Sequence, residues 1–102
     1  MLPSNRRPTP PGEILRHEFL DPLNLSQKEL AEALGITRVR LSEIIHGKRS
    51  VTPDTACRLA RFFDTTPEFW LGLQTDVNLW DTIEAHRQEY ERIKPLETAA
   101  KG

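Results

Sequence analysis

The sequence predicts an all-α fold, and three observations point to it. Residues that cap helix N-termini recur at short intervals, and the apolar residues between them are spaced three and four positions apart. No alternating β-branched run bounded by turn residues predicts a strand. With 102 residues, of which 37% are hydrophobic and 28% charged, the chain has room for one small domain with a marginal core that dimerisation would stabilise.

The first ten residues are rich in proline and polar groups, and they predict a flexible arm. A helix should begin near Pro11, because proline is tolerated in a first turn. Its apolar face would consist of Ile14, Leu15 and Phe19. Because the residue before a proline avoids helical geometry, Pro22 is expected to end this helix near Leu20.

The second predicted helix begins with a capping box. The Ser26 hydroxyl can accept from the backbone N–H of Glu29, whose carboxylate reaches back to Ser26. Gly35 would close the helix, since glycine readily adopts the left-handed conformation found there. The predicted inner face is Leu30, Ala31 and Leu34.

Three more helices are predicted from N-caps at Thr37, Thr52 and Thr66, the last two followed by a proline at the first helical position. A sixth helix should run from Val77 to about Tyr90. Residues 11–78 are therefore expected to form the main domain, residues 79–94 a C-terminal helix, and residues 95–102 a frayed tail. The predicted inner residues of the third, fourth and fifth helices are Leu41, Ile44, Ile45, Ala56, Leu59, Ala60, Phe63, Phe69, Trp70 and Leu73.

Several classes of protein are disfavoured by composition. No apolar run approaches the roughly 20 residues that cross a bilayer, and no signal peptide is evident, so a cytoplasmic location without membrane contact is expected. Cys57 is the only cysteine and lies in an apolar periodic stretch, which predicts a buried residue. The three histidines share no ligand spacing, so neither a metal nor another cofactor is expected.

Charge is unevenly distributed along a chain whose net charge is only −1. Between residues 36 and 50, four basic residues oppose one acidic residue, whereas residues 64–93 are strongly acidic. This pattern predicts a localised surface for phosphate groups.

The second and third helices, with the short turn at residues 35–37, have the features of a helix-turn-helix spanning residues 26–46. Ala31 is small where the two helices would cross, and Ile36 can fill the space under the turn. The third helix would then be the one that enters the major groove of DNA.

The outward residues of this third helix are candidates for reading bases. An arginine can donate two hydrogen bonds to guanine, valine can contact a thymine methyl group, and a carboxylate can accept from cytosine. Glu43 has the alternative of pairing with Arg40, and an ordinary solvated helix face remains open for the whole set. The candidates are Arg38, Val39, Ser42 and Glu43.

Phosphate contacts are expected at the margins of the motif, where helix N-terminal amides and basic side chains lie. A basic surface loop without a ligand is the alternative reading. The predicted set is Gln27, Thr37, Arg40, Lys48 and Arg49.

The last part of the chain carries more apolar surface than one helix stripe can hide. It predicts a homodimer, the arrangement that reads two half-sites about one helical turn apart. Burial in the core is the alternative for part of the set. The residues assigned to this interface are Trp70, Leu71, Leu73, Gln74, Val77 and Trp80.

Over residues 10–79 the sequence resembles the HigA antitoxins of the Xre-like helix-turn-helix repressor superfamily. The specific segments are PGEIL at 11–15, LSQKELA at 25–31, GKRSVTPDTACRLARFF at 47–63 and TTPEFWLGLQ at 65–74. The resemblance implies a five-helix lambda-repressor-like domain with an additional C-terminal helix. It also implies a dimer that represses its own operon at operator DNA and neutralises a RelE-like messenger-RNA-cleaving toxin of the HigB type.

Three alternatives to an antitoxin-repressor stay open. A solitary Xre-type repressor would lack a toxin partner. A protein-interaction module would have lost DNA binding, against which the arginines of the third helix argue. An enzyme is disfavoured because no nucleophile–base pair, glycine-rich phosphate loop or carboxylate cluster is evident.

Overall fold

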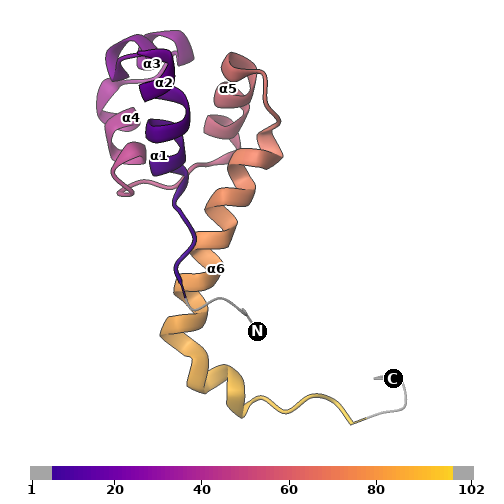
Figure 1. Cartoon of the computed structure of the whole chain (residues 1–102). Helices are drawn as coiled ribbons and strands as arrows, with labels where there is room; N and C mark the ends of the chain where they lie inside the picture. Colours follow the sequence, from indigo (N-terminus) through magenta and orange to yellow (C-terminus); the bar gives the residue numbers. More distant parts are fainter. Residues whose placement is uncertain (1–5, 98–102) are drawn as a thin grey trace.

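Helices account for most of the computed structural model, which describes residues 6–97 (Figure 1). The elements are α1 (Pro11–Ile14), the π-helical η1 (Leu15–Leu20), α2 (Asp21–Leu23), α3 (Gln27–Leu34), α4 (Arg38–Ile45), α5 (Pro53–Phe63) and α6 (Pro67–Arg92). No strand occurs among these described residues, and the all-α prediction is confirmed. The expectations for residues 1–5 of the arm and 98–102 of the tail lie outside the described residues.

The predicted N-caps are confirmed at α3, α4, α5 and α6. In each, a serine or threonine hydroxyl accepts from the backbone N–H three residues later, which satisfies a donor that has no partner within the helix. The capping box at Ser26 is complete, since the Ser26 N–H also donates to the Glu29 carboxylate over 2.9 Å.

The prediction that the first helix ends near Leu20 is wrong. The helical run continues through Pro22 to Leu23. The reason is the wider π-helical register of η1, in which the N–H of Asp21 donates to the carbonyl of Arg16, five residues earlier. Pro22 then stands in the first turn of α2, where a missing N–H costs little. Asn24, with φ of 52°, ends the run.

The predicted fifth and sixth helices are one continuous helix, α6. The prediction of a break between two helices near Val77 is wrong. The residues from Gly72 to Leu79 include no proline and no cap that would end a helix. A kink lies further along α6, at His86, whose φ of −125° is not helical. The predicted boundary after residue 78 falls inside this helix, and the division into domains stays a prediction.

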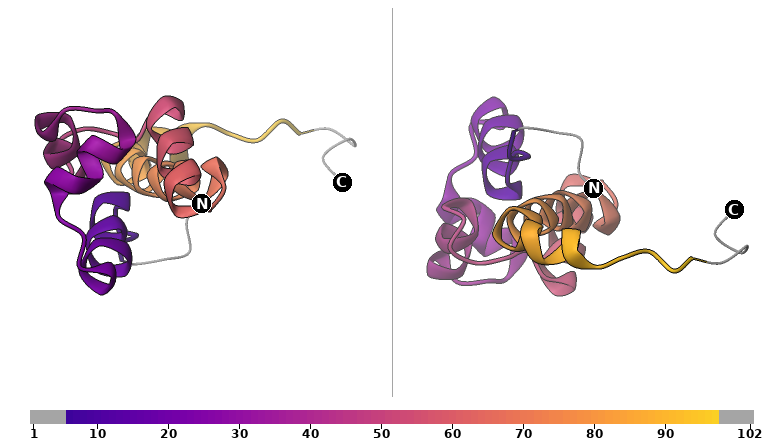
Figure 2. Two further views of the ribbon diagram at one scale, coloured as in Figure 1. Left: turned by 90° about the horizontal axis from the view of Figure 1, so that it is seen from above. Right: turned by 90° about the horizontal axis from the view of Figure 1, so that it is seen from below.

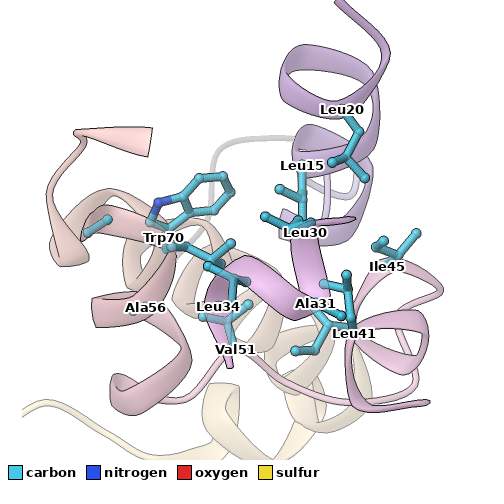
Figure 3. Packing of buried hydrophobic residues seen from close by; sticks show 13 residues of the cluster. Leu15, Leu20, Leu30, Ala31, Leu34, Leu41, Ile45, Val51, Ala56 and Trp70 are labelled. Carbon is cyan, nitrogen blue, oxygen red and sulfur yellow. The ribbon is translucent and has the colours of Figure 1, made fainter. Parts of the chain in front are cut away.

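Apolar residues from every helix except α2 meet in one core (Figure 3). Trp70 is its largest fully buried side chain, and its indole N–H donates to the Thr65 hydroxyl over 2.8 Å. The rings of Phe19 and Phe63 lie against Trp70 and each other. The first turn of α6 therefore closes the core that the preceding helices build.

Cys57 is exposed, so its predicted burial is wrong. Ala56, Leu59 and Ala60 form the buried face of α5. Because each helical residue is rotated about 100° from the last, Cys57 lies beyond the edge of that face.

The molecule is elongated, with extents of 55 × 24 × 22 Å. Helices α1–α4 lie to one side of α5 and α6, and α6 extends well beyond this group (Figures 1 and 2). The N-terminal arm runs beside α6, where Arg7 donates two hydrogen bonds to the Asp81 carboxylate over 2.8 and 2.9 Å. In the described part of the chain, no helix is apolar and long enough to cross a membrane.

Candidate nucleic-acid interface

The helix-turn-helix lies where the sequence predicts it, in α3, the turn at residues 35–37, and α4. Gly35 has φ of 72°, a conformation that side chains with a Cβ disfavour, and its N–H donates to the carbonyl of Glu32. The N–H of Ile36 donates to the carbonyl of Ala31 over 3.1 Å. These two bonds reverse the chain directly after α3 and set the direction in which α4 begins.

The inner face of α4 is fixed by burial. Leu41, Ile44 and Ile45 are at most 5% exposed, and Ala31 of α3 is buried as predicted. Ile36 is partly buried against the same core. With its inner face buried, α4 presents its other face to solvent in one orientation.

Two of the four predicted base-reading residues stand on this outer face without obstruction. Arg38 is exposed and has no side-chain partner among the described residues, and Val39 is 68% exposed. Ser42 is half-buried next to His46, whose Nδ1 lies 2.8 Å from the Ser42 carbonyl oxygen. The first turn of α4 therefore offers a cation with free donors beside an apolar contact.

Glu43, the fourth of these residues, pairs with Arg49 and not with Arg40. Its Oε1 lies 2.9 Å from Arg49 Nε and 2.7 Å from Arg49 Nη2. The loop after α4 brings them together, since the N–H groups of Lys48 and Arg49 both donate to the Glu43 carbonyl. A candidate base-reading carboxylate and a candidate phosphate-binding arginine are thus in direct contact.

The other predicted phosphate-binding residues differ in availability. Lys48 is exposed, Gln27 is half-buried at the start of α3, and Thr37 is exposed, with its hydroxyl accepting from the N–H of Arg40. The Arg40 guanidinium is already held, because its Nη2 donates to Asp54 and Thr55. Arg40 would have to break these bonds to reach a phosphate.

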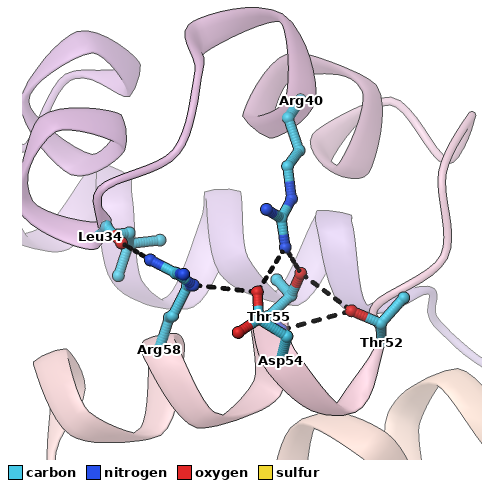
Figure 4. A network of polar contacts seen from close by, with 6 residues as sticks. All are labelled: Leu34, Arg40, Thr52, Asp54, Thr55 and Arg58. Carbon is cyan, nitrogen blue, oxygen red and sulfur yellow. Dashed lines mark hydrogen bonds and ion pairs between the residues drawn. The ribbon is translucent and has the colours of Figure 1, made fainter.

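Sequence reasoning missed the polar network that surrounds Arg40 (Figure 4). Asp54 Oδ2 accepts from Arg40 Nη2 over 3.0 Å and from Arg58 Nε over 2.9 Å. These bonds hold the pKa of Asp54 below its ordinary value, and the bond from Arg40 has the larger effect. The only local signal was the spacing of Asp54 and Arg58, four residues apart on one helix.

The predicted dimer set needs correction at two positions. Trp70 is fully buried and Val77 is 4% exposed within a single chain, so neither has surface to offer a partner. Leu71 and Leu73 are partly buried against the core, and Gln74 accepts from the N–H of Val51 over 2.8 Å.

Trp80 is the member of that set whose buried polar group lacks a hydrogen-bond partner among the described residues. It is half-buried on α6, and its indole N–H is buried with no hydrogen-bond partner in the described part of the chain. Leu79 beside it is 46% exposed. The dimer interface stays a prediction, for which Leu71, Leu73, Gln74 and Trp80 remain candidates.

The chain is similar to a helix-turn-helix family and to named bacterial proteins. The helix-turn-helix family HTH_3 matches residues 17–70. The antitoxin HigA-1 of Vibrio cholerae is 43% identical, over 94% of this chain and 90% of that protein. The HTH-type transcriptional regulator YbaQ of Escherichia coli K12 is 44% identical, over 98% of this chain and 88% of that protein.

Solved structures agree with these relatives. The antitoxin HigA of Pseudomonas aeruginosa, solved with the higBA promoter, matches with a TM-score of 0.84 and 40% identity, covering 88% of this chain and 99% of that one. The antitoxin GraA in complex with its operator matches with a TM-score of 0.84 and 38% identity, covering 96% and 100%. The chain therefore belongs to the Xre-like helix-turn-helix family, among the HigA-type antitoxins.

Proposed function

We propose that this chain is an antitoxin and transcriptional autorepressor that binds operator DNA as a dimer and neutralises a HigB-like toxin. The observation that carries the DNA-binding part is the outer face of α4, where Arg38 and Val39 are exposed on a helix whose inner face is fully buried. A rigid helix with free donors in its first turn suits base reading in the major groove. Relatives solved with an operator or a promoter support the same role.

In this proposal, Arg38, Val39, Ser42 and Glu43 contact base edges, and Gln27, Thr37, Lys48 and Arg49 contact the DNA backbone. Glu43 can reach a base when Arg49 turns to a phosphate, because each would exchange its present partner for one on the DNA. Backbone contacts orient the protein, and base contacts provide the sequence preference. The role is one of binding without catalysis, in the cytoplasm.

The experiment is a gel-shift titration on the DNA upstream of the chain's own gene, with a scrambled duplex as the control, at two salt concentrations. We expect tight binding to the first duplex by a dimer, weaker binding to the second, and a steep loss of affinity for both at higher salt. Equal, weak binding to both duplexes would contradict autorepression.

A solitary repressor without a toxin is the second candidate. It is favoured by the similarity to YbaQ, whose name is that of an HTH-type transcriptional regulator. Co-expression with the product of the neighbouring gene separates the two proposals. A stable complex that relieves growth arrest supports the antitoxin, and an intact growth rate without any complex supports the solitary repressor.

A further inference from the structure

We propose that Asp54 is a positioning residue for sequence recognition, acting through Arg40 to hold the first turn of α4 against α5. The proposal rests on the proposed function in DNA binding. Asp54 is the second residue of α5, outside the helix-turn-helix, and its carboxylate lies at the centre of the network in Figure 4.

The contact between α4 and α5 is built on Arg40. Its Nη2 donates to Asp54 Oδ2 over 3.0 Å and to Thr55 Oγ1 over 2.7 Å. Thr55 is 1% exposed, so its hydroxyl does not move freely, and the Arg40 side chain is itself only 27% exposed. The guanidinium is therefore held between an exposed carboxylate and a buried hydroxyl.

Helix geometry converts this contact into an orientation for the residues that face DNA. Positions two apart on a helix point about 200° apart. Holding Arg40 against α5 therefore directs Arg38 to the opposite side, where it is exposed. A bidentate contact with guanine requires such a fixed direction, whereas a contact with a phosphate tolerates displacement.

Asp54 also reaches the other helix of the motif. Arg58 Nε donates to Asp54 over 2.9 Å, and Arg58 Nη1 donates to the carbonyl of Leu34, the last residue of α3, over 2.7 Å. One carboxylate thus links the end of α3 and the start of α4 to the same turn of α5. The three-residue turn between them is held from both sides.

The stabilising contribution of this network is expected to be small, because exposed ion pairs contribute little to the free energy of folding. The Asp54 side chain is 59% exposed. Removing its charge should leave the fold and the buried face of α4 intact and loosen the position of the first turn of α4, where Arg38 lies. The measurable consequence is a loss of discrimination between DNA sequences.

The test compares operator and scrambled duplexes in gel shifts with the full chain and its variants Asp54→Asn, Arg40→Met and the double variant. We expect Asp54→Asn to lower the ratio of the two affinities at least about fivefold, the lower end of what one base contact contributes. Arg40→Met should lower this ratio similarly. The double variant should lower it no further, because both changes remove the same interaction between Arg40 and Asp54. Urea unfolding verifies that every variant is folded under the assay conditions.

Asp64→Asn is the matched control. It makes the same change of charge at the C-cap of the same helix, where Asp64 has φ of 58°, a conformation that asparagine also adopts. The ratio of the affinities for the operator and scrambled duplexes should not change in Asp64→Asn.

Three outcomes would overturn the proposal while the function stands. If Asp54→Asn raised both affinities equally, the carboxylate would act only by charge. If Arg40→Met weakened both duplexes equally, Arg40 would be a phosphate contact. Additive losses in the double variant would overturn the route through Arg40, and an unselective unaltered chain would overturn the proposed function and this inference together.

Discussion

Gly12 lets α1 approach the end of α4 closely because glycine has no Cβ. A Cβ at this position would collide with the backbone carbonyl oxygens of Ile44 and Ile45, at the end of α4. We expect Gly12→Ala to destabilise the protein by about 1–3 kcal/mol, because neither backbone group can move without displacing α4. Urea unfolding measures the change.

Gly72→Ala is the control for that substitution. A Cβ there meets nothing within 4 Å, and the residue lies inside α6. Alanine should raise the free energy of unfolding by up to about 1 kcal/mol, since glycine is the poorer helix former. A loss of stability in both variants would contradict the role of close approach at Gly12.

The two kinds of DNA contact can be separated at the level of residues. Arg38→Ala should cost about 1–3 kcal/mol of operator affinity and relax the sequence preference, because it removes a base contact. Gel shifts with operator and scrambled duplexes measure both effects. An unchanged ratio of affinities in Arg38→Ala would exclude base reading by this residue.

Lys48→Ala tests the backbone contact. It should weaken binding to all duplexes alike and reduce the slope of log affinity against log salt by about 1, because one fewer phosphate is neutralised. A salt slope identical to that of the unaltered chain would mean that Lys48 does not touch the backbone.

At the scale of elements, the capping box of α3 supports the N-terminal half of the helix-turn-helix. Ser26→Ala should lower the free energy of unfolding by about 0.5–2 kcal/mol, because the N–H of Glu29 loses its acceptor. Thermal unfolding followed by circular dichroism measures this loss. Ser26→Asp, which keeps an acceptor at the cap, should retain most of the stability, and an equal loss in both variants would contradict capping.

Helix starts, the turn and most of the inner residues could be predicted from sequence because they depend on neighbours within four positions. The hydroxyls of Thr37, Thr52 and Thr66 cap helices irrespective of tertiary structure. The π-helical register of η1 could not be predicted in this way. It changes the hydrogen-bond partner by one residue, and no feature of residue type marks that change.

Contacts between distant residues were also beyond sequence reasoning. Arg7 and Asp81 are 74 positions apart, and Arg40 meets Asp54 only once α5 has packed against α3. For the same reason, the exposure of Arg38 and Val39 on α4 follows from the helical period, whereas the partners of Glu43 and Arg40 do not. Periodicity identifies the face of a helix, but the position of neighbouring helices decides which charges meet.

At the scale of the molecule, the pair between Arg7 and Asp81 fastens the N-terminal arm to α6. The hydrogen bonds from Arg7 hold the pKa of Asp81 below its ordinary value. A lowered folded-state pKa stabilises the fold above the unfolded-state pKa of about 3.9, and the contribution disappears as pH falls through the folded-state value. Asp81→Asn should therefore be less stable than the unaltered chain at pH 7 and equally stable at a pH below the folded-state pKa of Asp81.

Urea midpoints at both pH values measure this difference. Asp76→Asn, on the same helix, is the control for charge alone and should show a smaller difference at pH 7. Because both partners of the Arg7–Asp81 pair are substantially exposed, about 1 M salt should reduce the difference at neutral pH. A pH-independent difference would assign the effect to side-chain packing.

The continuity of α6 has a mechanical consequence. Trp70, in the core, and Ile83 belong to the stretch of α6 that precedes the kink at His86, and they are separated by 13 residues, or about 20 Å at the helical rise. A molecule that binds α6 around Ile83 contacts the same helix whose first turn, at Trp70, lies among the aromatic rings of the core. Binding there is therefore expected to oppose unwinding of α6 at Trp70, and unwinding at Trp70 is expected to weaken that binding.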